Sequence, residues 1–288
     1  MPIEWKSALS FDEKIQMINF AQLLLKPRHM TRERPRLPST EAASSTDNAP
    51  SLRQISVEHV HVKPRSRLVL LTDPKGSGAD RLRLLRMRLR ELKDLTKLQS
   101  LLITSPMPGD GKSTIALNLA TALAERGKRS VLLIEADLYH PSLAEGLGLE
   151  ERGGLAECLE NQHDPMSLLR CLEPLGCYLL PAGKPVSNPT ELLESESFSS
   201  VMRSLSPHFD WILIDTPPVI PLTDAVSLSR RVDGSLLVVR ADRTPRDAID
   251  QAVSLLGPKH VLGIVLNASD RLNKVYSKYY GYGHYDKK

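Results

Sequence analysis

The sequence predicts an α/β fold with a mostly parallel central sheet flanked by helices. Its short apolar runs are continuous rather than alternating, which is typical of strands buried on both faces. Stretches with helical spacing lie between these runs, as the crossovers of a parallel sheet require. One run leads directly into a glycine-rich turn and a further helix, which is the order of a strand–loop–helix phosphate site. The predicted strands lie within residues 68–72, 100–104, 130–137, 177–182, 210–218, 234–242 and 260–267.

We expect three parts along the chain. Residues 1–65 form an N-terminal segment with a short amphipathic helix near 11–26 and a flexible linker rich in Pro, Ser, Thr and Arg. That helix fits a docking element for a partner and an ordinary packing helix equally well. Residues 66–270 form the P-loop domain, and residues 271–288 form a flexible tail rich in tyrosine.

The composition is that of a soluble globular protein with a formal net charge of +4. Its three cysteines form no CxxC pair, which favours a reducing compartment over a disulfide framework or a zinc site. No apolar run approaches the roughly 20 residues that span a bilayer, and the first residues lack the pattern of a signal peptide. We therefore expect a cytoplasmic chain with no transmembrane segment of its own, soluble unless a partner brings it to a membrane.

Residues 105–114 read SPMPGDGKST and form the predicted phosphate loop. Glycines let the backbone N–H groups turn around a polyphosphate, and the helix N-terminus adds partial positive charge. In such loops the lysine, Lys112, reaches the β- and γ-phosphates, and the hydroxyl of Ser113 binds Mg²⁺. The strict motif begins with glycine, where this chain has Pro106. The predicted ATP-binding residues are Pro108, Gly109, Asp110, Gly111, Lys112, Ser113 and Thr114.

Three acidic residues follow or end predicted strands, namely Glu135, Asp137 and Asp215. Ligands of parallel α/β sheets bind outside the carboxyl ends of the strands, where the phosphate loop also lies. Mg²⁺ is usually held by phosphates, waters and one or two carboxylates, so we expect Ser113, Asp137 and Asp215 to form a metal site. Any one of these carboxylates alone could instead cap a strand-to-helix turn, but this alternative is much less plausible for both Asp137 and Asp215 beside a phosphate loop.

Five segments together, in their order and spacing, resemble one family. They are the phosphate loop 105–114, EADLYHP (135–141), GGLAECL (153–159), residues 179–195 and WILIDTPPVIPLTDA (211–225). They are similar to the bacterial tyrosine kinases (BY-kinases), the P-loop autokinases of capsule and exopolysaccharide synthesis, over residues 66–288. The resemblance implies a partition-ATPase-like P-loop fold and a non-specific protein-tyrosine kinase (ATP:protein-tyrosine phosphotransferase). It also implies catalytic roles for Lys112, Asp137, Glu135 and Asp215.

The C-terminal tail holds five of the chain's seven tyrosines. Core tyrosines are normally distributed over the elements that bury them, whereas these are clustered among glycines without a hydrophobic period. With the resemblance, this cluster is the predicted phosphoacceptor, presented to a neighbouring subunit; a low-complexity terminus is the alternative. The predicted acceptors are Tyr276, Tyr279, Tyr280, Tyr282 and Tyr285.

A helix is predicted over residues 79–93, with leucines on one face and arginines on another. Alone, the arginines would suit a solvated face or a nucleic-acid patch, but the aromatic partners of the latter are absent, and we expect no nucleic-acid partner. The resemblance implies that Asp80, Arg83 and Arg86 mediate subunit contact in a ring, with aspartate in place of the family's glutamate.

Two departures from the family pattern leave a second function open. The family has aspartate where this chain has Glu135, and arginine where it has Tyr139, so Arg152 or another subunit would have to supply that cation. The alternative is a catalytically weak or inactive nucleotide-binding switch or scaffold for polysaccharide assembly. A chromosome-partition or septum-site ATPase fits less well, because Met107 replaces its signature lysine. Expected partners are a membrane-embedded polysaccharide co-polymerase or activator, further copies of the chain, and a cognate tyrosine phosphatase.

Overall fold

In the computed structural model the described residues are 52–63, 66–220 and 222–268. Residues Met1–Gln54 and Ile55–Lys288 form separate units, and the sheet belongs to the second. The strands are β1 (Ser56–His59), β2 (Ser100–Thr104), β3 (Val131–Glu135), β4 (Arg170–Glu173), β5 (Cys177–Leu180), β6 (Trp211–Asp215), β7 (Gly234–Arg240) and β8 (Val261–Asn267). The helices are α3 (Val69–Thr72), α4 (Ser77–Thr96), α5 (Lys112–Ala124), α6 (Leu143–Gly146), α7 (Leu155–Asn161), α8 (Pro189–Glu194), α9 (Glu196–Leu205), α10 (Asp224–Ser229) and α11 (Arg246–Leu256), with short 3₁₀ turns η1 (Leu52–Gln54), η2 (Pro165–Leu168) and η3 (Ser206–His208).

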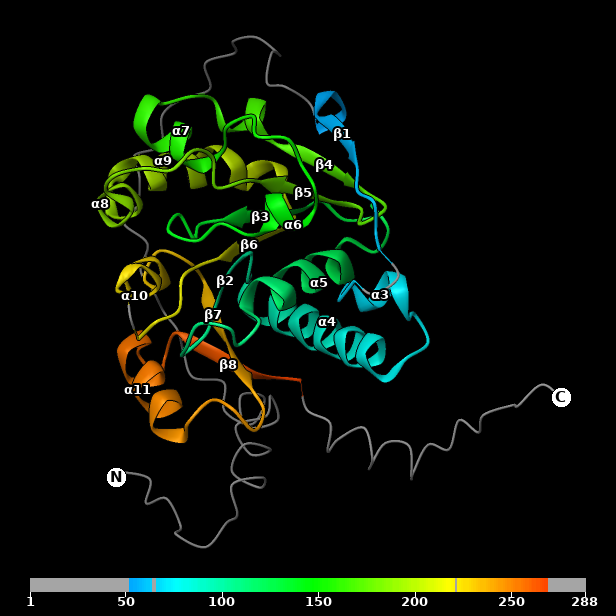
Figure 1. The fold of residues 1–288 in the computed structure, drawn as a ribbon, viewed down its shortest axis with the longest axis vertical. Helices are drawn as coiled ribbons and strands as arrows, with labels where there is room; N and C mark the ends of the chain where they lie inside the picture. Colours follow the sequence, from blue (N-terminus) through cyan, green and yellow to red (C-terminus); the bar gives the residue numbers. More distant parts are fainter. Residues whose placement is uncertain (1–51, 64–65, 221, 269–288) are drawn as a thin grey trace, which may run out of the picture. The chain divides into compact units, whose positions relative to one another are not determined.

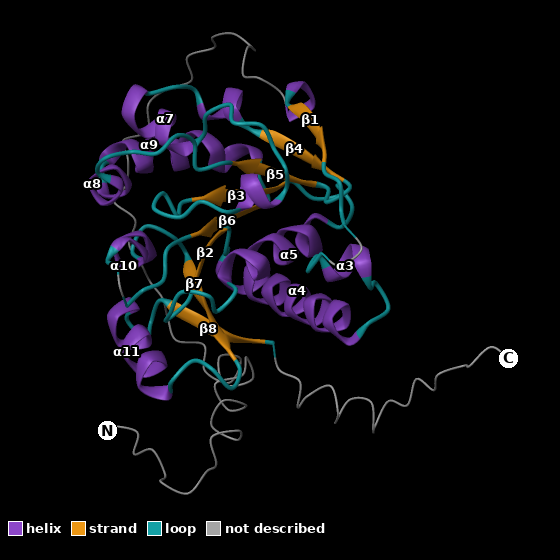
Figure 2. Cartoon of the chain, viewed as in Figure 1, coloured by secondary structure: helices purple, strands orange, loops and turns teal. Residues whose placement is uncertain are grey.

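The eight strands form one sheet in the order β1-β4-β5-β3-β6-β2-β7-β8. Every neighbouring pair is parallel except β4 and β5, which are antiparallel, so the predicted mostly parallel sheet is confirmed. Figure 1 shows α4 and α5 on one face of the sheet and α10 and α11 on the other. The central strands β2, β3 and β6 are almost wholly buried, because helices cover them on both sides (Figure 2).

Helices α4 and α5 position the phosphate loop. Helix α4 turns its buried leucines, among them Leu82, Leu89 and Leu92, toward the interior and packs on α5. Every residue of α5 from Ala116 to Ala124 is buried, since the helix lies between α4 and the sheet. Its many alanines suit this position, because small side chains allow close approach on all sides.

The predicted strand at 68–72 is wrong, since Val69–Thr72 is the short helix α3. A short apolar run does not distinguish a strand from a buried turn of helix. Here tertiary contacts decide: the side-chain oxygen of Asn118 on α5 accepts a hydrogen bond from Val69 N at 3.0 Å, and α3 packs on α4 and α5.

The sheet begins earlier than residue 66, the predicted start of the P-loop domain. Residues Ser56–His59 form β1 and pair in parallel with β4, so the compact unit starts at Ile55. The sequence does not predict β1, because the strand is mostly exposed and has no continuous apolar run. It forms through its pairing with β4, which only the tertiary structure shows. The predicted helix at 11–26 and the tail 271–288 lie outside the described residues.

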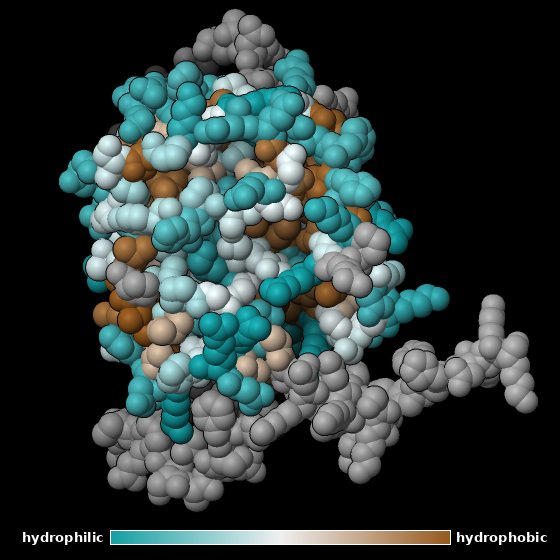
Figure 3. Space-filling model, in the orientation of Figure 1, coloured by the Kyte–Doolittle hydropathy of each residue, from teal (hydrophilic) through white to brown (hydrophobic). Residues whose placement is uncertain are grey.

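Within the described part of the chain, no helix is both long and apolar enough to cross a membrane. On the face shown in Figure 3, hydrophilic residues cover most of the surface and hydrophobic ones form small separate patches. The large apolar side chains are instead concentrated in the core around the sheet.

Candidate active site

The loop between β2 and α5 has the geometry of a phosphate cradle. Gly109 and Gly111 adopt φ values of 81° and 94°, in the left-handed region that favours glycine. A Cβ atom on Gly111 would lie 2.2 Å from Nδ2 of Asn267, so a side chain here would displace the Asn267 amide. Helix α5 then begins at Lys112, with its N-terminal N–H groups at the end of the loop.

The loop is held by the ends of β7 and β8. Asn267 Nδ2 donates to Asp110 O at 2.8 Å, and a guanidinium nitrogen of Arg240 donates to Gly109 O at 3.1 Å. The carboxylate of Asp110 accepts from Met107 N at 3.1 Å and from the Thr244 hydroxyl at 2.8 Å. Asp110 is therefore buried and structural, so it shapes the loop through its side chain.

Arg240, Thr244 and Asn267 were not predicted as site residues. They belong to the segments after or at the end of β7 and β8, at the same sheet edge as the predicted carboxylates. The rule that ligands bind at the carboxyl ends of parallel strands was a signal that could have found them.

Lys112 lies between two carboxylates. Its Nζ is 2.8 Å from Asp137 Oδ2, 3.9 Å from Asp215 Oδ1 and 3.2 Å from the Ser113 hydroxyl. All of these charged groups are largely buried, with side-chain exposures of 13% for Lys112, 6% for Asp137 and 1% for Asp215. The structure thus brings together Lys112, Ser113, Asp137 and Asp215, as the sequence predicts.

Asp215 is the most perturbed acid of the site. Burial raises the pKa of its carboxyl to about 7, opposed by the Lys112 ammonium and the Ser113 hydroxyl and reinforced by the charges of Asp137 and Glu135. Among the described residues neither carboxylate oxygen has a hydrogen bond of ordinary geometry, and the Lys112 ammonium at 3.9 Å and the Ser113 hydroxyl are its polar neighbours. A buried carboxylate with free lone pairs is suited to a cation or its water shell.

Glu135 is bound quite differently from the other two acids. Its Oε1 accepts hydrogen bonds from Ser142 N and Leu143 N, both at 2.6 Å, and its Oε2 accepts from Ala182 N at 3.2 Å. Glu135 and Asp215 lie opposite each other in the neighbouring strands β3 and β6. The carboxylate of Glu135 is nevertheless occupied by backbone N–H groups. This arrangement fits a residue that holds the segment after β3 in place.

The residues after Asp137 give the site no further cation in ion-pair contact. Asp137 Oδ1 accepts from His140 N at 3.1 Å, and the Tyr139 hydroxyl lies 2.9 Å from Thr190 Oγ1. Arg152 forms ion pairs with Glu150 at 2.8 Å and Glu58 at 3.2 Å, so its guanidinium is engaged elsewhere.

The predicted subunit contacts on α4 make intramolecular interactions. Arg83 pairs with Asp80 at 2.7 Å and donates to Pro74 O at 2.6 Å, while Arg86 donates to Ala122 O of α5 at 3.3 Å. The neighbouring Arg90 pairs with Glu125 at 2.7 Å. Much of the positive charge of this helix is thus balanced within the chain.

The donor set fits Mg²⁺ held jointly with phosphate. Within the described residues, no three His, Cys, Asp or Glu side chains lie close enough to hold a metal by themselves. Asp137, Asp215 and the Ser113 hydroxyl supply oxygen ligands only, which is what a hard cation that keeps waters and phosphates requires. The orphaned oxygens of Asp215 are the structural observation that favours it.

A strand, a glycine loop and a helix N-terminus at the carboxyl edge of a parallel sheet define a P-loop NTPase. The family described as "ParA: NUBPL iron-transfer P-loop NTPase" matches residues 97–280. Tyrosine-protein kinase YwqD of Bacillus subtilis is 31% identical over 223 residues, covering 77% of this chain and 92% of YwqD. Tyrosine-protein kinase wzc of Salmonella typhimurium is 30% identical over 224 residues, but the chain spans only 31% of its length.

Among solved structures, the kinase domain of Escherichia coli tyrosine kinase ETK is similar, with a TM-score of 0.67 and 25% identity over 72% of this chain and 82% of that domain. The chain therefore belongs to the ParA-like P-loop NTPases and, within them, to the bacterial tyrosine-protein kinases. It is a nucleotide-binding enzyme of the kinase class, as the resemblance predicted.

Proposed function

We propose that this kinase is an ATP-dependent autokinase that phosphorylates the tyrosine cluster 276–285 of another copy of the chain. The observation that carries the proposal is the placement of the Lys112 ammonium between Asp137 and Asp215 at the start of α5. Phosphoryl transfer to a hydroxyl needs a positive charge beside the phosphates and a carboxylate that can accept the hydroxyl proton.

The loop residues bind and orient the nucleotide. Backbone N–H groups from Gly109 to Thr114 surround the phosphates, and Lys112 exchanges its contact with Asp137 for the β- and γ-phosphates. Ser113 and Asp137 would hold Mg²⁺ and Asp215 would orient its water shell, and the ion would neutralise charge on the phosphates. Since phosphoryl transfer depends mostly on positioning and charge stabilisation, these few groups suffice.

Asp137 is the proposed base. Once Lys112 has turned to the phosphates, Asp137 Oδ2 loses its ammonium partner and accepts the phenol proton, which leaves Oδ1, the acceptor from His140 N, for the cation. The tyrosine oxygen then bonds to the γ-phosphorus as the bond to the bridging oxygen breaks, and ADP leaves. Glu135 contributes by fixing the segment that carries Asp137, since its own oxygens are occupied.

The test is phosphotyrosine mapping of the purified, phosphatase-treated full chain before and after incubation with ATP and Mg²⁺. Wild type should gain phosphate on tyrosines within 276–285. Lys112→Met should gain almost none, whereas Lys75→Met, an exposed lysine before α4, should behave as wild type. Wild-type labelling in Lys112→Met would contradict the site assignment.

A nucleotide-dependent switch or scaffold is the second candidate. It is favoured by Tyr139, which replaces the arginine of the family pattern and whose hydroxyl faces Thr190, and by the engagement of Arg152 in other ion pairs. ATP binding without phosphate on any tyrosine, even at long incubation, would favour this function over the autokinase.

We further propose that the kinase regulates capsule or exopolysaccharide synthesis and export. By the resemblance, a membrane-embedded co-polymerase or activator would recruit the chain from the cytoplasm to the inner face of the membrane, and a tyrosine phosphatase would reverse the labelling. Self-assembly through Asp80, Arg83 and Arg86 would require Arg83 and Arg86 to exchange their present partners for a second copy. Arg86→Glu should lower the molar mass in light scattering if that contact forms; an unchanged assembly would exclude it.

A further inference from the structure

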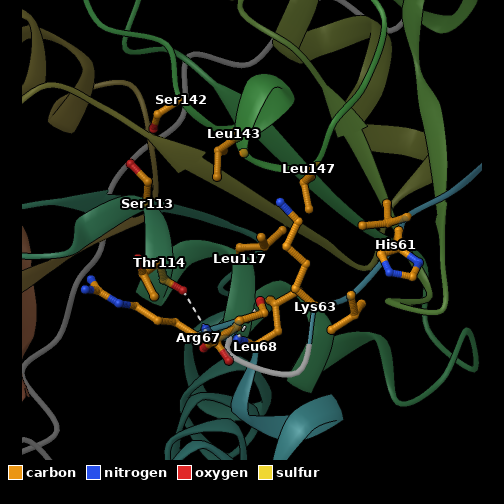
Figure 4. Close-up of a pocket in the computed structure, with 15 residues that line it drawn as sticks. His61, Lys63, Arg67, Leu68, Ser113, Thr114, Leu117, Ser142, Leu143 and Leu147 are labelled. Carbon is orange, nitrogen blue, oxygen red and sulfur yellow. Dashed lines mark hydrogen bonds between the residues drawn. The ribbon is translucent and has the colours of Figure 1, made fainter.

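A pocket of about 360 Å³ lies beside the phosphate loop, and of the residues that line it only Ser113 and Thr114 have a role in the proposed mechanism. It is bounded by residues 60–63 and 66–68 ahead of α3, by one side of α5 and by the segment that contains α6 (Figure 4). Ser113 and Thr114 lie at its edge, but Lys112 and the loop glycines do not line it. It therefore adjoins the nucleotide site without being part of the phosphate cradle.

The pocket combines apolar walls with basic side chains. Leu68, Leu117 and Leu143 are buried and form an apolar wall, while the cations of Lys63 and Arg67 and the imidazole of His61 are exposed at its rim. Figure 4 shows the Lys63 side chain extending toward Leu143 of α6 and toward Leu147, which follows that helix. No aspartate or glutamate lines the pocket, and the structure gives neither Lys63 nor Arg67 a carboxylate partner among the described residues.

These features fit a ligand that carries both a negative charge and an apolar group. An isolated phosphate would leave the leucine walls unused, and a neutral ring would leave the cations uncompensated. An aryl phosphate satisfies both, since its ring packs on leucine and its oxygens accept charge-assisted hydrogen bonds.

We propose that this pocket binds a phosphotyrosine side chain of the C-terminal tail after that tyrosine has been phosphorylated. The proposal rests on the proposed function, which makes the tail the substrate. Residues 271–288 carry five lysine and arginine side chains against one aspartate, so the unmodified tail is repelled by a cationic pocket. Each phosphate adds close to two negative charges and reverses that preference.

The position of the pocket gives this binding a consequence. Successive tail tyrosines are separated by one to three positions, and three extended residues reach about 10 Å. With one phosphotyrosine in the pocket beside Ser113, a neighbouring tyrosine lies within reach of Lys112 and Asp137. The first phosphate thereby retains the tail for the next transfer.

The test uses fluorescent synthetic peptides of residues 271–288, either unmodified or phosphorylated at Tyr280, with the full-length, phosphatase-treated chain and no nucleotide. Because the phosphate is introduced chemically, a chain without kinase activity can still show the binding, so the two proposals fail separately. Fluorescence anisotropy should show the phosphopeptide binding at least about tenfold more tightly than the unmodified peptide.

Two variants and one control locate the binding. Lys63→Glu should weaken phosphopeptide binding about tenfold or more, whereas Lys128→Glu, the same charge reversal beyond the other end of α5, should not. Leu147→Ser should weaken competition by phenyl phosphate while leaving competition by inorganic phosphate unchanged, because only the ring contacts the apolar wall.

Equal affinity for both peptides, or equal effects of Lys63→Glu and Lys128→Glu, would overturn the proposal. Phenyl phosphate competing no better than inorganic phosphate would also overturn it, by showing a non-selective anion site. Sedimentation with vesicles of anionic phospholipid that depends on Lys63, without phosphopeptide binding, would assign the pocket to a membrane surface instead.

Discussion

The buried carboxyl of Asp215 should make the nucleotide-free protein lose stability as pH rises. Its pKa is about 7 in the folded chain, against an ordinary value of 3.8. Between these two values the folded chain holds a proton that the unfolded chain has released, so the free energy of unfolding falls as pH rises. The fall is about 1.4 kcal/mol per pH unit and amounts to about 4 kcal/mol above pH 7, on the order of the cost of burying this charge.

Asp215→Asn removes this titration while keeping nearly the same shape. We expect the variant to be more stable than wild type by a few kcal/mol at about pH 8, with the difference disappearing near pH 4, where both folded and unfolded wild type begin to hold the proton. The same variant should lose phosphoryl transfer, because the orphaned oxygens that suit the cation's water shell are replaced by an amide.

Urea unfolding followed by circular dichroism, at several pH values and without nucleotide or Mg²⁺, measures the difference. Asp250→Asn, which changes an exposed carboxylate on α11, serves as the control and should leave the pH profile as it is. If Asp215→Asn gave the same pH profile as wild type, burial would not be the dominant influence on this carboxyl and the reasoning would be refuted.

Four further variants test the phosphate loop and the segment after β3. Gly111→Ala and Gly127→Ala both place alanine at positive φ, which should lower the free energy of unfolding by about 1–2 kcal/mol each. Only at Gly111 does the new Cβ contact Asn267, so only Gly111→Ala should abolish binding of a fluorescent ATP analogue. Glu135→Gln turns an amide donor toward a backbone N–H and should lower the free energy of unfolding by about 1–3 kcal/mol in urea; unchanged stability would mean that its backbone contacts are unimportant. Asn267→Ala should weaken ATP-analogue binding several-fold while costing only about 1 kcal/mol of stability, and wild-type affinity would show that the Asp110 contact does not shape the loop.

The fold class and the phosphate loop could be predicted because they depend on local chemistry. Continuous apolar runs identify buried strands, and the order strand, glycine turn, helix with Lys112 and Ser113 identifies the cradle without any knowledge of distant contacts. The predicted acids Asp137 and Asp215 were also found for this reason, since strand ends of a parallel sheet meet at one edge.

Other elements could not be predicted, because their sequence fits more than one structure. The run 68–72 is apolar enough for a strand, but hydrogen bonding to Asn118 and packing on α4 and α5 make Val69–Thr72 a helix. The strand β1 has almost no buried face and exists through its pairing with β4.

The sequence by itself determined the centre of the candidate site: a glycine loop, one lysine, one hydroxyl and the acids at the strand ends. Only the tertiary structure decided how the three acids differ. Glu135 is occupied by backbone N–H groups, Asp137 pairs with Lys112, and Asp215 is buried without a hydrogen bond of ordinary geometry from any residue that the structure describes. The reason is physical: the charge and reactivity of a carboxyl depend on its burial and its neighbours, and residues far apart in the chain supply both.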